Sequence, residues 1–591
     1  MHPCQLDRTI DEKLSSVSVG SIHYTKLKKI VTLSTAESLD LPISASITEN
    51  DKVIRRSEGL FVICQNGLAK IYPSYNETEC VKIGNRRLRL RIKEIENKGE
   101  ENAQKSLCEF HYRGGKTFGR RSKLIIKTEE DDTPAVIGYI ELSIASLSNK
   151  ARNIILNSPY DDGTVNWKEW DFSARGKYAK LIVSVSRIVI HPEFRGIGLS
   201  ETLLKHAILF SKNYWQISGQ KPIFLEITAD MLKFVPFVQK VGMAYIGNTA
   251  GNVDRVKRDI AYMLKNKKGY IKHSHSAMIR MQSHYLKHFI ETCKEKKISP
   301  SKLMYEISTL DKDSIRSKYP LIYGLLRFPK PTFMLGLNGY SDKFIRIRAH
   351  ELEIKPIEKF RMAKSEPIDS PIMFNSVSLE LDSSVTETKR TMAIQESFGI
   401  HREHTKNTVI RDFNLNIDSG DIVLFCGSSG SGKSSLLNIL LGRVQPSSGV
   451  VIRPKNMRIG LLKKLDSKKP LIEVVGRTLE KSIYALNKSG LSEPKLYLRT
   501  FDNLSAGQKY RAMIASLITS KSNVWIADEF LMSLDNMSAN IVAANVRKFV
   551  KEQGITLTVA SSNPENYLSS LNPDKIVIKY TGNCHSIGKN R

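Results

Sequence analysis

Residues 422–441 read IVLFCGSSGSGKSSLLNILL, in which an apolar run, a glycine-rich turn and a second apolar run follow one another. The pattern GxxxxGK[ST] is met by Gly427, Gly432, Lys433 and Ser434. Glycines let the backbone wrap around phosphate groups, and amides at the start of the next helix donate hydrogen bonds to them. The lysine neutralises β- and γ-phosphate charge, and the serine hydroxyl is a ligand for Mg²⁺. The stretch therefore predicts a strand, a phosphate-binding loop and a helix that hold ATP.

A second motif follows in residues 524–529, VWIADE, where an apolar strand ends in two carboxylates. Asp528 is expected to hold Mg²⁺ through water, together with the hydroxyl of Ser434. Glu529 is expected to polarise the water that attacks the γ-phosphate, which makes it a catalytic candidate. Asp-Glu after an apolar run is a weak signal alone, but its place downstream of a phosphate-binding loop makes the interpretation specific.

Between these two motifs, residues 504–508 read LSAGQ. Here the sequence resembles the ABC ATPase family, whose signature is close to LSGGQ, and residues 533–535, SLD, match the D-loop of that family. The resemblance covers residues 390–591. It implies a head-to-tail homodimer with two ATP molecules at its interface. Ser505 and the amide of Gly507 would contact the γ-phosphate held by the opposite subunit, at a helix N-terminus suited to anions.

The resemblance places ATP contacts in both the loop and the signature. The residues expected to bind ATP are Gly427, Ser428, Ser429, Gly430, Ser431, Gly432, Lys433, Ser434, Ser435, Leu504, Ser505, Ala506, Gly507 and Gln508. Two family positions differ: Lys463 and Lys464 replace the Q-loop glutamine, and Ser561, Ser562 and Asn563 replace the switch histidine. Both positions normally help to place the attacking water, so the differences leave ATP binding intact and argue against fast hydrolysis. The short segment between Lys464 and LSAGQ favours a role other than membrane transport.

Residues 186–200, SRIVIHPEFRGIGLS, contain a second candidate phosphate-binding turn. They resemble motif A of the GNAT acyltransferases, Arg/Gln-x-x-Gly-x-Gly/Ala, with Ser200 at the last position. The resemblance implies a GNAT fold in which helix N-terminal amides face the pyrophosphate of acetyl-CoA or another acyl-CoA. An RGxG turn between a strand and a helix also occurs for structural reasons. The residues expected to bind acyl-CoA are Ile190, Arg195, Gly196, Ile197, Gly198, Leu199 and Ser200.

The segments that follow, IFLEIT and MLKFVPFVQKVGMAYIG, are similar to the end of the GNAT fold. With the ABC-type motifs downstream, they resemble prokaryotic and phage proteins in which an ABC-type ATPase is fused to a predicted acetyltransferase domain. An amine acceptor needs a general base, for which Glu226 is the first candidate and Glu141 the second. A solvated strand carboxylate is an equal alternative for both. Tyr245 is the candidate acid, because Phe237 and Val238 stand where the family tyrosine is expected.

The overall composition limits which partners and which cellular compartment are expected for the chain. No apolar stretch approaches the ~20 residues that span a bilayer, and the N-terminus lacks a signal-peptide run, so a soluble protein with no membrane partner is expected. Seven scattered cysteines without a CxxC pair favour a reducing, cytoplasmic location. The formal charge of +30 over 591 residues favours nucleic acid or another polyanion as partner, with a lysine-rich solvated surface as the alternative.

These features predict an α/β multidomain chain, with a GNAT acyltransferase fold and a P-loop ABC-type nucleotide-binding domain. The expected parts are a β-rich basic segment (1–104), a GNAT-like domain (105–265), a basic helical connector and linker (266–389) and an ABC-type ATPase domain (390–591). Residues 52–73 are expected to form a hairpin around Asn66-Gly67. His284 and His288 stand four apart, but without an adjacent carboxylate a solvated basic helix is favoured over a metal site.

The first functional hypothesis is an N-acyltransferase in which ATP-driven dimer closure controls transfer of an acyl group from acyl-CoA to an amine. The alternatives are a nucleic-acid-handling ATPase with a non-catalytic GNAT module, or a DNA-modifying enzyme of the Mom-like type. A transporter ATPase ranks last.

Overall fold

The computed structural model describes residues 19–25, 28–32, 38–41, 52–64, 67–72, 74–84, 86–110, 120–130, 133–217, 220–265, 277–382, 386–399, 406–580 and 584–588. The chain divides into two compact units, each assembled from separate stretches of sequence. Unit 1 contains Met1–Leu142, Arg187–Gly219 and Glu358–Arg591, and unit 2 contains Ser143–Ser186 and Gln220–Ile357. The phosphate-binding motif and the N-terminal strands therefore belong to one unit.

The C-terminal part of unit 1, called the cassette below (residues 358–591), is built on a six-stranded sheet in the order β21-β22-β23-β19-β24-β25. The pairs are parallel except for β24 with β25. Parallel strands that are covered on both faces read as continuous apolar runs, as IVLFC and VWIA do. The bounds are Ile422–Cys426 for β19, Ile459–Leu461 for β21, Val524–Ala527 for β22, Thr556–Ser561 for β23, Lys575–Lys579 for β24 and Cys584–Gly588 for β25.

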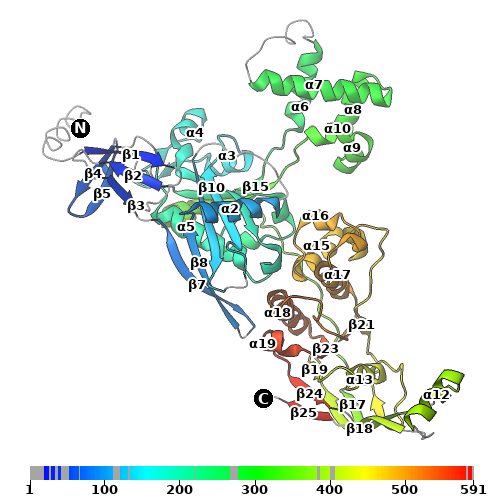
Figure 1. Ribbon diagram of the computed structural model, residues 1–591. Helices are drawn as coiled ribbons and strands as arrows, with labels where there is room; N and C mark the ends of the chain where they lie inside the picture. The colour runs from blue at the N-terminus through cyan, green and yellow to red at the C-terminus, as the bar shows by residue number, and fades with distance from the viewer. Residues whose placement is uncertain are drawn as a thin grey trace, which may run out of the picture. The chain divides into compact units, whose positions relative to one another are not determined.

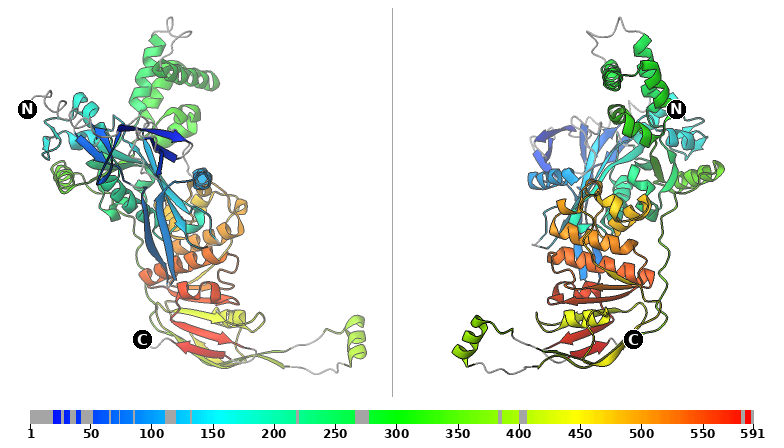
Figure 2. Two further views of the ribbon diagram at one scale, coloured as in Figure 1. Left: turned by 60° about the vertical axis from the view of Figure 1, so that its left-hand side comes forward. Right: turned by 90° about the vertical axis from the view of Figure 1, so that its right-hand side faces the viewer.

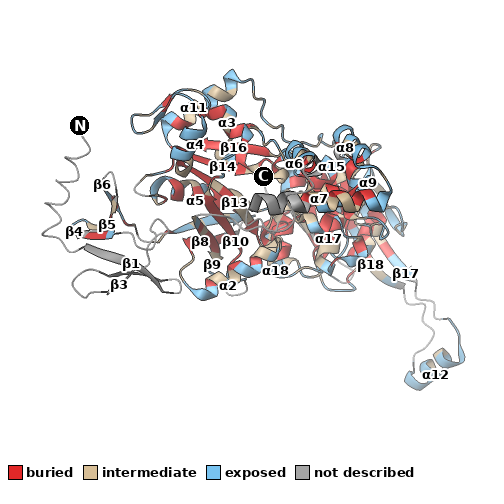
Figure 3. Cartoon of the chain, turned by 90° about the horizontal axis from the view of Figure 1, so that it is seen from above, coloured by how far each residue is buried: buried red, intermediate tan, exposed pale blue. Residues whose placement is uncertain are grey.

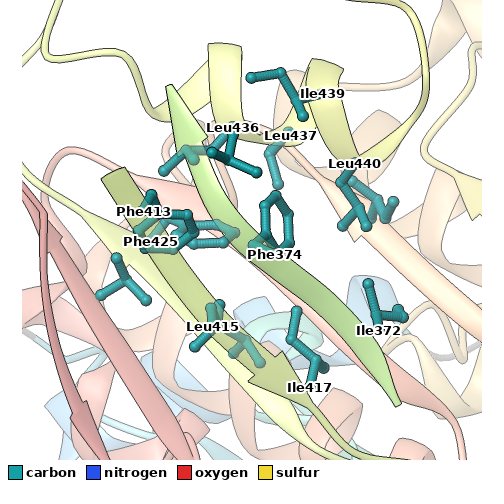
Figure 4. Close-up of a cluster of buried hydrophobic side chains, with 14 of the residues drawn as sticks. Ile372, Phe374, Phe413, Leu415, Ile417, Phe425, Leu436, Leu437, Ile439 and Leu440 are labelled. Carbon is teal, nitrogen blue, oxygen red and sulfur yellow. The ribbon is translucent and has the colours of Figure 1, made fainter. Parts of the chain in front are cut away.

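A second sheet of the cassette has the order β18-β17-β20, with β17 Ile372–Asp382, β18 Lys406–Ile417 and β20 Ser448–Ile452. Helix α13 (Lys433–Leu440) packs its apolar side chains against these strands and β19. Figure 4 shows the resulting cluster, with Phe374, Phe413 and Phe425 beneath the leucines of the helix. This packing fixes the helix that starts directly after the glycine-rich loop.

The other cassette helices are α12 Lys389–Phe398, α14 Leu471–Val474, α15 Leu479–Lys488, α16 Pro494–Tyr497, α17 Ala506–Thr519, α18 Asn536–Gln553 and α19 Leu568–Leu571. Helix α17 begins directly after the LSAGQ serine, and α18 begins directly after the D-loop aspartate. Helix α12 has no buried residue and stands away from both sheets, as Figures 2 and 3 show.

Upstream of the cassette, strands form an eight-stranded sheet in the order β15-β16-β14-β13-β10-β9-β8-β7. The bounds are Asn76–Ile83 for β7, Arg86–Glu94 for β8, Arg121–Thr128 for β9, Gly138–Ile144 for β10, Ile182–Ile190 for β13, Phe224–Thr228 for β14, Ala244–Asn248 for β15 and Pro331–Gly336 for β16. Strands β10 and β13 have residues in both units. Figure 3 shows how deeply the central strands are buried. The sheet begins at Asn76, well before the predicted boundary at residue 105.

The basic stretch Arg86–Glu94 is strand β8, in which Leu88, Leu90 and Ile92 alternate with Arg and are buried in the core. The first strands of unit 1 make an antiparallel sheet, β3-β2-β1-β4-β5-β6, with β1 Val19–Thr25, β2 Lys28–Thr32, β3 Ser38–Leu41, β4 Lys52–Arg56, β5 Gly59–Cys64 and β6 Gly67–Lys70. The predicted hairpin is present, because Cys64 pairs with Gly67, while Asn66 itself lies outside the described residues.

Unit 2 contains α3 Lys150–Leu156, β11 Tyr160–Asp161, β12 Asn166–Trp167, α4 Phe172–Tyr178 and α11 Gly339–Glu351. Between β15 and β16 the chain adds five helices, which Figure 1 shows as one group: α6 Val253–Lys265, α7 Ala277–Lys296, α8 Pro300–Thr309, α9 Lys312–Lys318 and α10 Pro320–Leu325. The basic helices predicted near residues 271–298 thus belong to an insertion in the sheet and not to a connector.

Inside unit 1, the strand hairpin β7–β8 packs on the end of the cassette. Gly84 has φ +60°, and a Cβ on it would lie 2.3 Å from the Cα of Ser570. The Ser570 hydroxyl donates to the carbonyl of Ile83 (3.2 Å), and the Lys495 ammonium donates to the carbonyl of Glu109 (3.1 Å). The N-terminal strands and the cassette are therefore in backbone-to-backbone contact at a point that only glycine permits.

Replacing Gly84 by Ala is expected to lower stability more than replacing Gly420, whose φ of +77° is similar but whose Cβ would meet nothing within 4 Å. Both alanines carry the cost of a positive φ, about 1 kcal/mol. Only Gly84→Ala adds an overlap with the cassette backbone, worth about 1–3 kcal/mol more. Thermal unfolding and limited proteolysis of the two variants measure the difference. Equal midpoints would contradict the close packing at Gly84.

Candidate functional site

The glycine-rich loop joins β19 to α13, as the sequence predicts. Gly427 has φ +146° and Gly432 has φ +101°, both outside the range of ordinary L-residues. A Cβ on Gly427 would lie 2.1 Å from the carbonyl oxygen of Lys579, and one on Gly432 would lie 2.6 Å from Val409 Cγ1. Gly427 and Gly432 must therefore be glycines, both because of their positive φ angles and because a Cβ atom would overlap with neighbouring atoms.

The loop concentrates hydrogen-bond donors and positive charge. The ammonium of Lys433 is 2.8 Å from the carbonyl oxygens of both Gly427 and Ser428, and the residue is 9% exposed. Helix α13 has no side-chain cap, so its first amides are not satisfied by its own side chains. The buried Ser431 hydroxyl has no hydrogen-bond partner among the described residues, and Gly430 borders open space. These groups fit a phosphate chain, and Ser434, in the first turn of α13, fits a ligand for Mg²⁺.

The two acidic residues follow β22, which is separated from β19 by β23 alone. Because carboxyl ends of parallel strands meet at one edge, the topology brings Asp528 and Glu529 to the edge that holds the loop. Both are exposed, and Asp528 Oδ1 accepts from the amide of Glu529 at 3.0 Å. Glu529 has φ +48° and Leu531 φ +61°, a conformation that costs about 1–3 kcal/mol per residue unless neighbours enforce it.

Two buried tyrosines enforce that conformation. The amide of Leu531 donates to the hydroxyl of Tyr510 (3.0 Å), and the hydroxyl of Tyr567 donates to the carbonyl of Phe530 (2.9 Å). Tyr510 lies two residues after the LSAGQ motif on α17, so the signature helix holds the backbone around Glu529. Sequence reasoning missed both tyrosines, and the position of Tyr510 directly after the signature was the available signal.

The signature residues form the start of α17. Ser505 Oγ accepts from the amide of Gln508 (3.3 Å), and Gln508 Oε1 accepts from the amide of Ser505 (3.1 Å), which makes a capping box. A Cβ on Gly507 would lie 3.0 Å from Leu534 of the D-loop, so signature and D-loop are packed together. Ser505, Gly507 and the other signature residues remain predicted ATP contacts across a dimer.

The residues that replace the Q-loop glutamine and the switch histidine of the family follow strand β21 and lie at the end of strand β23, respectively. Lys463 and Lys464 follow β21 and are exposed. Ser561 ends β23 and is buried, and the Ser562 hydroxyl donates to the sulfur of Met532 at 3.2 Å. Asn563 donates its amide to Ser561 Oγ (3.3 Å).

The RGIG turn of residues 195–198 is only partly covered by protein: Gly196 is exposed, and a Cβ on Gly198 would meet nothing within 4 Å. Arg195 donates from Nε to the carbonyl of Ile190 (3.0 Å), and burial lowers the pKa of its guanidinium, while the nearby Glu493 and Tyr497 oppose the shift. A Cβ on Gly196 would lie 2.5 Å from Asn545 Nδ2, on cassette helix α18. The N-terminus of α5 (Leu199–Asn213) is present and lacks a side-chain cap, as predicted, but the turn before it packs on protein.

The neighbouring segment Pro192–Phe194 also faces functional elements of the cassette. Burial raises the pKa of Glu193, the Asp535 carboxylate of the D-loop adds to the rise, and Arg511 of the signature helix opposes it. Burial lowers the pKa of Arg511 in turn, with Glu193 and Asp535 opposing the shift. The geometry therefore supports a packing contact with the cassette in place of the predicted acyl-CoA contacts.

The three predicted acid–base residues are not brought together. Glu226 is buried in an ion pair with Arg152 (Oε1 to NH1, 2.9 Å), and burial raises the pKa of Glu226 while Arg152 opposes the shift. In the β14–β16–β15 ladder, Ile227, Phe333 and Tyr245 are directly opposed. Adjacent residues of a strand point to opposite faces, so Glu226 and Tyr245 face opposite sides of the sheet and cannot act on one acceptor.

Glu141 is likewise held by the structure. It is buried on β10, with Arg121 NH1 at 3.9 Å and Arg187 Nε at 4.0 Å. Tyr245 packs on Phe333 with ring centroids 5.4 Å apart, and burial raises its pKa. These surroundings are those of structural carboxylates and a packed tyrosine.

Metal-binding clusters are absent from the part of the chain that the structure describes, which contains no group of three or more His, Cys, Asp and Glu arranged to hold an ion. His288 Nδ1 lies 3.0 Å from Glu291 Oε2 on α7, and the side chain of His284 falls outside the described residues. Within the described ranges, no helix has the length and apolar character needed to cross a bilayer.

Comparison with known proteins identifies the C-terminal part. The ABC transporter family model matches residues 410–531. The spermidine/putrescine import ATP-binding protein PotA of Mycoplasma capricolum is 25% identical over 221 residues, which are 33% of this chain and 61% of the relative. The zinc import ATP-binding protein ZnuC of a Ruegeria species is 34% identical over 141 residues, 22% of this chain and 56% of the relative. The chain thus spans about three fifths of the length of these relatives.

Among solved structures, the dimeric post-hydrolysis state of an ATP-binding cassette bound to ADP and Pi is 19% identical. The match covers 37% of this chain and 99% of that chain, with a TM-score of 0.30. The family match spans the glycine-rich loop, the signature and the Asp-Glu pair described above. Residues 410–531 therefore match the ABC transporter family model over the stretch that holds the ATP-binding motifs.

Proposed function

We propose that the cassette binds ATP with Mg²⁺, closes head to tail on a second copy of the chain, and hydrolyses ATP slowly. The observation that carries the proposal is the glycine-rich loop, where a buried lysine, an unpartnered buried hydroxyl and an uncapped helix N-terminus converge. That donor set matches the phosphates of a nucleoside triphosphate and little else.

In this mechanism the residues divide into holding and reacting groups. Lys433 and the loop amides bind and orient the β- and γ-phosphates, and Ser434 and Asp528 would hold Mg²⁺, which neutralises charge on the transferred phosphoryl group. Glu529 accepts the proton of the attacking water. Tyr510 and Tyr567 keep the Glu529 backbone in its left-handed conformation. Without a histidine or glutamine at Ser562 or Lys464, water placement rests mainly on Glu529, which supports slow turnover.

We further propose that the cassette acts on the N-terminal part of its own chain. The relatives are named as import ATP-binding proteins, whose partners are other molecules. Here the segment Pro192–Phe194 and Gly196 lie against helix α18, which begins directly after the D-loop aspartate. Movement of α17 or α18 on ATP binding would be passed directly to that segment.

The acyltransferase activity expected from residues 186–200 is not part of this proposal, since the turn packs on the cassette and Glu226 is ion-paired. A nucleic-acid partner concerns a different part of the molecule, residues 249–330.

Lys433→Ala is expected to weaken ATP binding at least about tenfold, because the phosphate charge loses its buried counter-charge. Glu529→Gln is expected to bind ATP normally, to lose turnover by about a hundredfold, and to accumulate as an ATP-bound dimer. Fluorescent-nucleotide titration measures ATP binding, phosphate release measures turnover, and light scattering with Mg-ATP measures dimer formation. Lys455→Ala, at an exposed cassette lysine outside every ATP-site motif, is the control. A Glu529→Gln protein that stays monomeric with ATP would remove the dimer from the proposal.

Tyr510→Phe is expected to lower kcat about tenfold while leaving KM for ATP unchanged, because it removes only the hydroxyl that accepts from Leu531. The lost hydrogen bond also costs about 1 kcal/mol of stability. Tyr497→Phe is the matched control, since that buried hydroxyl contacts Asn487 and not the Glu529 loop. Steady-state kinetics of both variants separate the roles. Equal kcat values would show that Tyr510 is structural only.

A further inference from the structure

Residues 249–330 are an insertion between two neighbouring strands. Strands β15 and β16 are antiparallel and Asn248 pairs with Pro331, an arrangement that a two-residue turn could join. Instead 82 residues intervene. The two ends of this insertion lie side by side. The amide of Thr249 donates to the carbonyl of Lys330 (2.8 Å), and the amide of Asn252 donates to the carbonyl of Arg327 (2.8 Å). The sheet does not need this insertion for its own pairing.

The insertion has a hydrophobic core of its own, made by its five helices. The buried residues of this core are Val256, Ile260, Tyr285, Phe289, Cys293, Leu303, Ile307, Ile315, Tyr319, Ile322 and Leu326. Most of the described surface residues are polar or charged, and the large apolar or aromatic side chains exposed among them are Tyr262, Tyr305 and Leu321. The insertion is therefore a folded module with a surface of distinct composition.

The sequence of the insertion carries a large share of the net charge of the chain. Residues 249–330 contain 18 Lys and Arg and 7 Asp and Glu, a surplus of 11 within a total of +30. More than a third of the net charge thus lies in about one seventh of the length. The basic residues described as exposed are Arg255, Arg258, Lys287, Lys294, Lys296, Lys297, Lys302, Arg316, Lys318 and Arg327.

The module has fewer acidic than basic residues, and several of the acidic ones are engaged in its own structure, while Asp254 and Asp313 are exposed. Asp311 caps α9 through the amides of Asp313 and Ser314 (2.9 and 3.0 Å). Glu306 accepts from the hydroxyl of Tyr319 (2.5 Å), and Asp259 lies 3.6 Å from Arg255. The positive potential of the surface therefore persists, and it extends over several helices rather than one.

An exposed aromatic ring sits within this positive surface. Tyr305 on α8 is 69% exposed. Lys302 lies one helical turn before it, and Lys318 of α9 reaches Glu306, the next residue, at 3.6 Å. The exposed face of the ring is free to take a flat partner, and the lysines beside it supply positive charge. Unpaired bases stack on such rings while lysines contact the adjoining phosphates.

We propose that residues 249–330 are a binding module for single-stranded nucleic acid. The exposed lysines and arginines contact phosphates, and Tyr305 stacks on an unpaired base. The chemistry is that of a polyphosphate backbone with exposed bases, which single-stranded DNA and RNA share. The proposal is independent of ATP binding and hydrolysis, since no residue of the cassette takes part.

The test compares binding of fluorescent dT30 and U30 to the full chain and to three variants. In the first, residues 250–329 are replaced by Asn-Gly, which closes the β15–β16 hairpin and is expected to abolish binding. Lys302→Glu with Lys318→Glu is expected to weaken binding about tenfold and to reduce the slope of log affinity against log salt by about two. Tyr305→Ala is expected to weaken binding about tenfold with the salt slope unchanged.

The matched control is Lys205→Glu with Lys212→Glu, two exposed lysines on α5 outside the module, which is expected to bind normally. Stronger binding of dT30 than U30, or the reverse, supports the module and names its sugar chemistry. Undiminished binding by the excised chain would overturn the proposal. So would tighter binding of a 30-base-pair duplex than of either single strand, or binding of anionic lipid vesicles without binding of either oligonucleotide.

Discussion

The parallel pairing of β19 with its neighbours β23 and β24 is the constraint on which the cassette depends. The chain leaves β19 at Gly427 so close to the end of β24 that a Cβ there would lie 2.1 Å from the carbonyl oxygen of Lys579. That contact turns the loop back over the edge of the sheet and points α13 away from it. On the other side, β23 separates β19 from β22 and fixes how far Asp528 stands from the loop. Loop, carboxylates and helix are thus placed by one edge of one sheet.

The structure could be predicted from short stretches of sequence where the contacts that determine it are made between residues close together in the chain. The strand, loop and helix of residues 422–441 follow from apolar runs, glycines with positive φ and a helix start, all within a few residues of one another. The capping box at Ser505 and Gln508 is local in the same sense. The tyrosines that hold the Glu529 loop lie 21 and 37 residues away from their partners, so their role depends on contacts that a short stretch of sequence does not contain.

The RGIG turn shows why a correct local prediction does not determine function. Its strand, glycines and helix are present, and the helix N-terminus is uncapped. The same geometry serves a phosphate or a protein side chain, and what covers it is Asn545, far along the chain. Glu226 is a second example. It lies on a strand, but its ion-pair partner Arg152 belongs to a different element. The alternation of apolar and polar residues along a strand predicts which face of the sheet a residue lies on. It does not predict which residues from other elements will contact it.

The chain uses positive charge in two physically different ways. Lys433 is buried and held by two backbone carbonyls, so its ammonium has one position and suits one phosphate group. The lysines described as exposed in residues 249–330, such as Lys294, Lys302 and Lys318, stand on flexible stems, so they suit a row of phosphates whose spacing is not fixed. A buried charge is screened little by salt, whereas exposed charges more than a Debye length apart are screened strongly. Salt should therefore separate the two functions: a concentration that leaves ATP bound at the loop will already release a polyanion from the helical insertion.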